Sequence, residues 1–323
     1  MHSRWQLFAA VALVAAALVL PPASADQSSR AAANTLEGQA WSAKTGAFVS
    51  EADVLAALKS APFVALGEIH DNAAHHLRRA QWIAAALAGR PIVFEHLRAD
   101  QQPALDTFSE LTARSPDKAT VAELKRVLDW DKSGWMKDGY DPLFQAAIDG
   151  KLPISAGDVT RAAIMNVAKS GEAALPASER ARLKLDVPLG AKLDDASLSE
   201  IEEAHCGAMP KEAFGGMAYA QRYRDASLAD AVLKAAEKVG AAVLIAGNGH
   251  VRTDRGVPWY VQQRAPDKTV ISVMFVEVED GQNDPQTYVP RDPDGKPAAD
   301  YMLFTARAER GDPCEKMREK MKK

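Results

Sequence analysis

Short apolar runs alternate along the chain with longer segments in which apolar residues recur every three or four positions. Four of the runs are rich in Val, Ile or Phe and apolar on both faces, which is typical of parallel strands buried on both sides of a sheet. A run at 270–278 alternates more and is expected nearer a sheet edge, and 301–305 is expected to add one more strand. The four apolar runs are residues 63–66, 92–94, 152–156 and 243–246.

The segments between these runs have helical spacing. Residues 72–88 carry an apolar stripe, begin at Asn72, a natural N-cap, and are stopped by Gly89 and Pro91. Strands that alternate with helices predict an α/β fold, in which a parallel sheet is flanked by helices on both faces. Further helices are expected at 102–111, 120–128 and 143–149.

The regular spacing breaks between the third and fourth strands. Residues 160–240 contain helical patterns and no strand-like run, so we expect a small all-helical domain inserted into the α/β domain. The α/β domain itself is then formed by 47–159 and 241–308. Residues 26–46 are polar and are expected to form a flexible arm, and 309–323 a charged tail.

The first 25 residues resemble a signal peptide. A short basic region precedes an apolar run at 7–20, and Ala23-Ser24-Ala25 supplies a cleavage site before Asp26. The run is shorter than the roughly 20 residues that a membrane span requires. We therefore expect cleavage after Ala25, a periplasmic mature protein and no membrane insertion afterwards.

Export changes the interpretation of the two cysteines. Cys206 and Cys314 would be in an oxidising compartment, so they are candidates for a disulfide, with two free thiols as the alternative.

Composition excludes one class of function. The net charge is −4, and Lys and Arg are not gathered in basic clusters, so a nucleic-acid surface is not expected.

Charged and metal-binding residue types follow the apolar strands. Glu68 and His70 come after the first, Glu95 after the second, Asp158 after the third and His250 after the fourth. Ligands of open α/β sheets bind at the carboxyl ends of the strands, so these side chains are expected to converge if the strands are neighbours. Two carboxylates and two imidazoles, Glu68, His70, Glu95 and His250, suit a divalent metal ion or general acid/base chemistry.

Structural roles remain open as alternatives for the same residues. Glu68 would cap the following helix, His70 would be a core histidine with satisfied hydrogen bonds, and His250 would belong to a tight turn. His96 should point away from Glu95 and is expected to be structural. His75 and His76 share a helix, where one is expected to face solvent.

A helix in the insertion gives a second signal. Its apolar stripe from 214 to 232 is interrupted by Gln221 and Asp225. Either this face borders a wet crevice, or the helix covers the strand ends and Asp225 orients a histidine from behind. Arg222 and Arg224 flank Asp225 and are candidates for holding an anion.

Taken in order, the polar motifs resemble those of the ChaN family of haem-binding, iron-uptake-associated proteins. The match covers roughly residues 50–275 and extends to a wider superfamily with erythromycin esterases and the TraB/Tiki group. The matching motifs are G-E-I-H-D at 67–71, F-E-H at 94–96, Gln101-Gln102, Trp130, Gly134-Trp135, Tyr140, Pro142-Leu143, His205-Cys206-Gly207, Met209-Pro210, Gln221-x-x-Arg224-Asp225, Gly247-Asn248-Gly249-His250 and Gly256-Val257-Pro258.

The resemblance implies a haem group held at the surface between the two parts of the fold, in an arrangement that a homodimer would share. It also implies a tyrosine as iron ligand, and Tyr140 is the first candidate, followed by Tyr219 and Tyr223. The other residues expected to bind the cofactor are His205, Arg224, Asp225 and Arg252.

Two functions therefore stand side by side. The first is a periplasmic haem-binding protein associated with haem and iron uptake. The second is a metal-dependent hydrolase of esterase or peptidase type, in which Glu68 or His70 acts as the base beside Glu95 and His250. Whether the protein is an enzyme is left open by the sequence. A Soret absorption band separates the two.

Overall fold

A computed structural model describes residues 34–312 except 137, together with 314 and 315. The expected signal peptide and its cleavage after Ala25 lie outside these residues, as does most of the charged tail. The described residues belong to one compact unit. No helix in this part of the chain is long and apolar enough to span a membrane.

An eight-stranded mixed sheet forms the centre of the fold, with the strand order β2-β1-β8-β7-β3-β6-β4-β5. The six strands from β8 to β5 are parallel, whereas β1 is antiparallel to β8 and β2 is antiparallel to β1. The strands are β1 (Ala40–Ser42), β2 (Ala47–Val49), β3 (Phe63–Leu66), β4 (Ile92–Arg98), β5 (Ile154–Asp158), β6 (Ala242–Ile245), β7 (Val270–Glu277) and β8 (Tyr301–Thr305).

All six strands expected from the apolar runs are present, but two expectations about the sheet are wrong. The expected flexible arm at 26–46 contains β1, whose three residues are buried against β8. The run at 270–278 does not lie near an edge, because β7 is flanked by β3 and β8. Both faces of β7 are covered, since Met274 packs into one core cluster and Val273 and Phe275 pack into the other.

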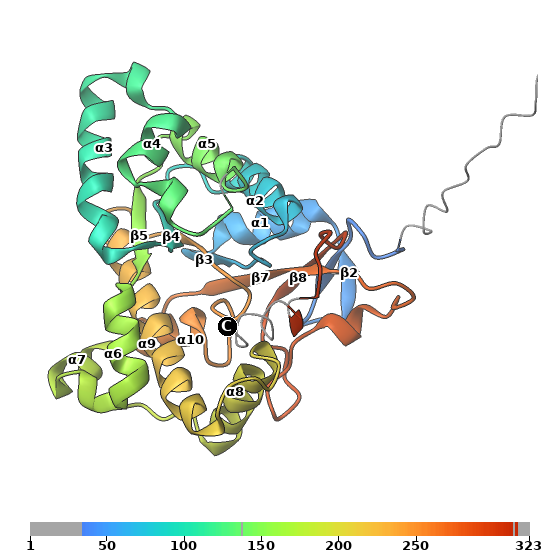
Figure 1. Ribbon diagram of the computed structural model, residues 1–323. Coiled ribbons are helices and arrows are strands. Elements are labelled where there is room, and N and C mark those ends of the chain that lie inside the picture. The colour runs from blue at the N-terminus through green and yellow to red at the C-terminus, as the bar shows by residue number, and fades with distance from the viewer. Residues whose placement is uncertain (1–33, 137, 313, 316–323) are drawn as a thin grey trace, which may run out of the picture. The chain divides into compact units, whose positions relative to one another are not determined.

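The described residues form ten α-helices, of which nine supply buried side chains to the core clusters of the sheet and α8 packs on α9. Figure 1 shows their arrangement around the sheet. Helices α1 to α5 supply buried side chains to one core cluster, while α6, α7, α9 and α10 supply them to the other. The helices are α1 (Glu51–Ser60), α2 (Ala73–Ala86), α3 (Gln102–Arg114), α4 (Val121–Val127), α5 (Asp141–Asp149), α6 (Arg161–Ser170), α7 (Ala177–Leu183), α8 (Ala191–Ala204), α9 (Lys211–Ala235) and α10 (Val257–Arg264).

Residues 160–240 are all described, and their regular elements are helices, α6 to α9 with one 3-10 turn. The long helix α9 packs along β4, β5 and β6. This segment therefore forms most of the second helical layer on the sheet, and it belongs to the same compact unit as the strands. The packing places α9 directly over one face of the strands whose carboxyl ends carry the candidate site.

Two side chains, Asn72 and Gln102, complete backbone hydrogen bonding at the start of α2 and at the edge of the sheet. Asn72 caps α2, because its side chain accepts hydrogen bonds from the backbone N–H groups of Ala74 and His75. On the edge strand β5, the N–H of Ala156 donates to the side-chain oxygen of Gln102 at 2.9 Å. This contact fills one hydrogen-bonding position that the sheet edge would otherwise leave open.

The two cysteines form a disulfide. Cys206 and Cys314 are 108 positions apart and their Cα atoms are separated by 5.6 Å. The prediction of a bond is confirmed. Cys206 lies in the turn between α8 and α9 and has a left-handed backbone with φ 55°. The bridge therefore joins this turn to the C-terminal segment.

Candidate functional site

The sheet order brings three of the chemistry-bearing strand ends together. Strand β6 lies between β3 and β4 and is parallel to both. Glu68 follows β3, Glu95 lies within the carboxyl half of β4, and His250 follows β6. Their side chains consequently meet at one edge of the sheet, as the strand pattern predicts. They form two adjoining clusters.

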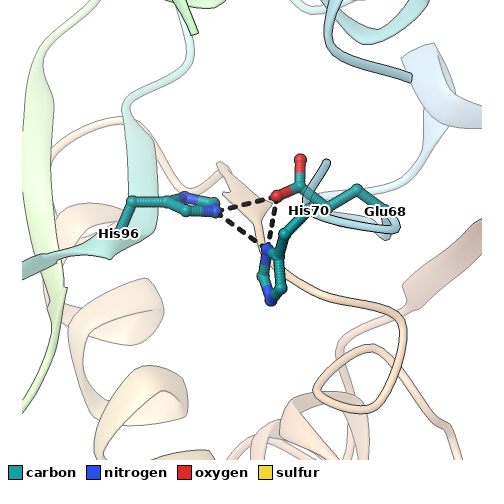
Figure 2. A group of neighbouring side chains, drawn as sticks. All are labelled: Glu68, His70 and His96. Carbon is teal, nitrogen blue, oxygen red and sulfur yellow. Dashed lines mark hydrogen bonds and ion pairs between the residues drawn. The ribbon is translucent and has the colours of Figure 1, made fainter. Parts of the chain in front are cut away.

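The first cluster is centred on the carboxylate of Glu68, which is 2% exposed. Its Oε1 accepts hydrogen bonds from His70 Nδ1 at 2.6 Å and His96 Nε2 at 2.9 Å, as Figure 2 shows. The hydroxyl of Tyr140 donates to the same oxygen at 2.5 Å. The His70 side chain is 39% exposed, whereas those of Glu68 and His96 are fully buried, so the cluster opens to solvent through His70.

Deeper in the protein, two residues of α2 contact the other oxygen of Glu68. Arg79 forms a fully buried ion pair with Oε2. His76 Nε2 lies 3.3 Å from Oε2, and its Nδ1 donates to the carbonyl oxygen of Gly139. Burial lowers the pKa of Arg79 to about 9 and that of His76 to about 4, so Arg79 supplies the positive charge and His76 is neutral at pH 7.

The tautomer of His70 follows from its hydrogen bond. A carboxylate oxygen only accepts, so Nδ1 carries the proton that is donated to Glu68, and the neutral ring leaves Nε2 unprotonated. Burial lowers the pKa of His70, outweighing the opposing effect of Glu95, and this favours the neutral ring. Glu68 thus orients His70 with a basic nitrogen free, which suits a general base or a metal ligand.

The second cluster surrounds His250. Its Nδ1 donates to Asp225 Oδ1 at 2.6 Å, and its Nε2 lies 3.1 Å from Glu95 Oε1. Arg224 from α9 bridges Glu95 at 2.8 Å and Asp158 at 2.6 Å. The backbone N–H of Gly247 donates to Glu95 Oε2 at 2.7 Å. Every member of this cluster therefore has a charged or hydrogen-bonded partner.

These contacts fix the charges of the second cluster. Burial alone would lower the pKa of His250, but the charges of Glu95 and Asp225 and the hydrogen bonds to both raise it to about 10. Burial would raise the pKa of Glu95, but His250, together with His70 and Arg224, holds it well below the usual range. At neutral pH His250 is therefore an imidazolium between two carboxylates.

The backbone of Gly247 lies between the two clusters. A Cβ atom at this position would lie 2.8 Å from His70 Nε2 and 3.6 Å from Glu95 Oε2. A side chain would displace His70, so only glycine leaves the free nitrogen of His70 and the carboxylate of Glu95 on either side of the same gap. The arrangement places a neutral base beside an ion-paired acid.

Most of the site residues expected from sequence are thus close together, and a few were missed. Glu68 contacts His70, and Glu95 contacts His250, but the two pairs lie on either side of Gly247 and do not surround one point. The group whose ligand atoms could hold one metal ion is Glu68, His70 and His96, without Glu95 and His250. Asp225 contacts His250 from α9, which is the orienting role expected of it. His96 was assigned a structural role, yet it contacts both Glu68 and His70. Its position directly after Glu95 at a strand end was the signal.

The histidines of α2 also differ from expectation, because His75 and His76 are both fully buried. His75 Nδ1 accepts from the N–H of Ile69 at 2.9 Å, and its Nε2 contacts Thr305 at 2.7 Å. His75 therefore holds the loop between Glu68 and His70, which is a structural role.

A cavity of about 240 Å³ adjoins the second cluster. Asp225 and Gln221 of α9 form part of its wall, and His205 lies in the wall at the end of α8. The Nδ1 of His205 donates to the carbonyl of Ile201 at 2.7 Å, which leaves Nε2 of the neutral ring without a proton. The lining residues are Leu189, Ser197, Glu200, Ile201, Ala204, His205, Ala218, Gln221, Arg222, Asp225, Gly249 and Arg255.

The arginines expected to hold an anion differ in their partners. Arg224 is neutralised by Glu95 and Asp158, and Arg252 by Asp254 and Glu200. Within the described residues, the guanidinium of Arg222 donates to neutral oxygens, namely the Tyr260 hydroxyl and the carbonyls of Leu185 and Val187. Of these three arginines, Arg222 lines the cavity and pairs with no carboxylate among the described residues.

Paired carboxylates and histidines thus lie at the carboxyl edge of the sheet in a three-layered α/β fold. Residues 54–261, more than half of the chain, match the family described as "Haem-binding uptake, Tiki superfamily, ChaN", and the chain belongs to this family.

Solved structures agree with this assignment at the level of the fold. A structure of ChaN from Campylobacter jejuni, described as showing cofacial haem binding, has 18% sequence identity and a TM-score of 0.62, and the alignment covers 82% of this chain and 95% of the other. An erythromycin esterase in its open conformation has 14% identity and a TM-score of 0.43, with 86% of both chains covered. No curated protein matches the sequence.

Proposed function

We propose that the protein is an exported haem-binding protein that acts in the periplasm in haem and iron uptake. The observation that carries the proposal is the cavity at the α8–α9 corner of a chain that belongs to a haem-binding family. Its wall supplies apolar surface from Leu189 and Ile201, an imidazole from His205 and a cation from Arg222. These are the three components that a haem site needs.

The tyrosines fit the iron less well than His205 does. Tyr140 is fully buried and donates its proton to Glu68, so its oxygen is not accessible to a large planar group. Burial raises the pKa of Tyr219 and of Tyr223, which disfavours the tyrosinate form. The hydroxyl of Tyr219 is buried and has no hydrogen-bond partner among the described residues. An imidazole binds iron through a nitrogen lone pair and does not need to form an anion first.

The size of the cavity bears on how the group would be held. Cofactor pockets usually enclose about 300–1,000 Å³, and this cavity is smaller. We infer that His205 would bind the iron and Arg222 would pair with a propionate, and that this cavity would enclose only part of the group. Haem supplies iron and redox chemistry when bound, and the residues of the cavity wall supply ligand, charge and apolar contact.

Titration of the purified mature protein with haemin tests this proposal. We expect a Soret band that saturates at one haem per chain, and His205→Ala should weaken binding by at least about tenfold, since an axial ligand is lost. Glu203→Ala, an exposed substitution on the same helix, is the matched control. Unchanged binding by His205→Ala would refute the assignment of the ligand. Mass spectrometry of periplasmic extracts tests export and cleavage. Absence of the protein from the periplasm would contradict export, and a chain that starts at Met1 there would contradict cleavage after Ala25.

The first cluster favours a second candidate, a metal-dependent hydrolase. Glu68, His70 and His96 each offer one ligand atom, and these atoms lie within 4.8 Å of one another. Two nitrogens and one oxygen, with solvent access through His70, match a catalytic site of zinc type. A divalent ion would act there as a Lewis acid toward a substrate carbonyl. His250 and Glu95 would supply charge and proton transfer on the far side of Gly247.

Metal analysis and ester hydrolysis assays on the same purified protein separate the two functions. The hydrolase predicts a bound or bindable divalent ion near one per chain, no Soret band and activity lost in His70→Ala. The haem-binding protein predicts a Soret band that survives His70→Ala, because His70 does not line the cavity of His205.

A further inference from the structure

The edge strand β5 borders a further cavity, about 590 Å³ in volume, which shares no lining residue with the cavity of His205. Helix α3 packs against β5 and forms the opposite wall. The floor is apolar, since Leu105 and Phe108 of α3 and Leu152 before β5 line the cavity and belong to the core cluster that α1 to α5 supply. The volume falls in the usual range of ligand pockets, about 300–1,000 Å³.

The backbone of β5 presents unused hydrogen-bonding groups to this cavity. The N–H of Ile92 on β4 donates to the carbonyl of Pro153 at 2.8 Å, so Pro153 faces β4. Successive residues of a strand turn their backbone groups to opposite sides, so the N–H and C=O of Ile154 both point away from β4. Ile154 lines the cavity, and on this side neither group forms a hydrogen bond with another described residue.

The next outward-facing residue shows which chemical group this edge accepts. Ala156 comes two positions after Ile154, and its N–H donates to the side-chain amide oxygen of Gln102 at 2.9 Å. An amide from α3 therefore takes the place that the carbonyl of an added strand would have. The edge is filled at Ala156 and open at Ile154, where one donor and one acceptor remain for a further amide backbone.

We propose that this cavity binds a short extended peptide, which pairs with Ile154 as an added strand and places an apolar side chain against Leu105 and Phe108. Free backbone groups of an edge strand give such a peptide its affinity, and pockets for its side chains give specificity. An amphipathic carboxylic acid would leave the carbonyl of Ile154 without a donor, because an ionised carboxylate only accepts hydrogen bonds. This inference does not rest on the proposed function, since haem would occupy the other cavity.

Hydrogen exchange of single amides in the full mature chain, followed by NMR, tests the proposal. The probes are blocked pentapeptides Ser-X-Ser-X-Ser in which both X residues are Val, Leu or Phe, with a Lys version as the polar control. We expect an apolar peptide to bind at one per chain and to slow exchange at Ile154 by at least about tenfold, since this N–H becomes hydrogen-bonded. The amide of Ser155 faces β4 and should not change. The same peptide with every backbone nitrogen methylated should bind at least about tenfold more weakly, because it cannot donate to Ile154.

Two variants of α3 locate the bound peptide. Ser109 and Glu110 are both exposed, but Ser109 lines the cavity and Glu110 does not. Ser109→Trp should fill the cavity and abolish binding, whereas Glu110→Trp should bind the peptide as the wild type does. Equal binding by the two variants, unchanged exchange at Ile154, or no binding of any apolar peptide at about 1 mM would overturn the proposal. Saturable binding of dodecanoate without binding of any peptide would assign the cavity to an amphipathic acid, and would overturn it as well.

Discussion

Asp225 Oδ1 lies 2.6 Å from His250 Nδ1, although Asp225 belongs to a helix of the second layer and His250 to a loop after the central strand β6. Both side chains are almost completely buried. The pair therefore joins the α9 layer to the carboxyl edge of the sheet by a charged hydrogen bond, and its strength depends on the protonation of His250.

Asp225→Asn should destabilise the protein in a pH-dependent way. The folded-state pKa of His250 is raised to about 10 from 6.5, so its contribution to stability is complete below pH 6.5 and is lost as the pH rises through 10. Removing one partner of a buried ion pair costs about 3–5 kcal/mol. Chemical denaturation of both proteins from pH 6 to pH 10 measures this. The difference between the unfolding free energies of the two proteins should be largest at pH 6 and should become smaller toward pH 10. A difference that grows with pH would contradict the positive charge assigned to His250.

Glu68→Gln should lower the free energy of unfolding much more than His70→Ala. Glu68 compensates the charge of Arg79, which is completely buried, so Glu68→Gln leaves that charge unpaired and should lower the free energy of unfolding by about 3–5 kcal/mol. His70 is partly exposed, and His70→Ala should change stability by less than about 1 kcal/mol. Thermal unfolding of the two variants is the measurement. A His70→Ala protein less stable than Glu68→Gln would refute the assigned roles.

Gly247→Ala should damage the site while leaving the core packed. The new methyl group would lie 2.8 Å from His70 Nε2, so the imidazole must move away from the gap that it shares with Glu95. We expect Zn²⁺ binding or hydrolysis that depends on His70 to fall by at least about tenfold, since about 1.4 kcal/mol is enough for that change. Gly249→Ala is the matched control, because nothing lies within 4 Å of a Cβ there. Equal effects of the two substitutions would exclude the proposed crowding.

Reduction of the Cys206–Cys314 bond should lower the thermal stability of the protein. The bridge closes a loop of 108 positions, and the chain-entropy model gives such a loop about 4–5 kcal/mol as an upper value. Residual structure in the reduced, unfolded chain usually makes the measured loss smaller than this value. Differential scanning calorimetry with and without a reductant measures this loss of stability. The Cys206→Ser/Cys314→Ser protein without reductant should unfold at the same temperature as the reduced wild type.

Much of the fold follows from local pattern. The strands at 63–66 and 243–246 were predictable because both of their faces are apolar, and parallel strands covered by helices need that composition. Strands β1 and β2 were not, since each has three residues and forms only through pairing with β8 or with each other. The pairing of β1 with β8 joins residues more than 250 positions apart and leaves no local signal.

The site was predictable in part for a physical reason. Residues that follow buried strands have to meet when those strands are neighbours, which places Glu68, Glu95 and His250 together. Alternation correctly puts His96 and Glu95 on opposite faces but misjudges the role of His96, because side chains from both faces reach the same carboxyl edge. Arg79 was missed because its partner, Glu68, is specified by the packing of α2 on the sheet.

The contact between Gln102 and the N–H of Ala156 has a consequence for how copies of the protein associate. Strand β5 forms one edge of the sheet, where an unpaired backbone donor would invite a strand from a neighbouring molecule. A side-chain amide already occupies that donor, so joining two sheets edge to edge there would require Gln102 to be displaced first. Self-association by sheet extension is disfavoured at this position of β5.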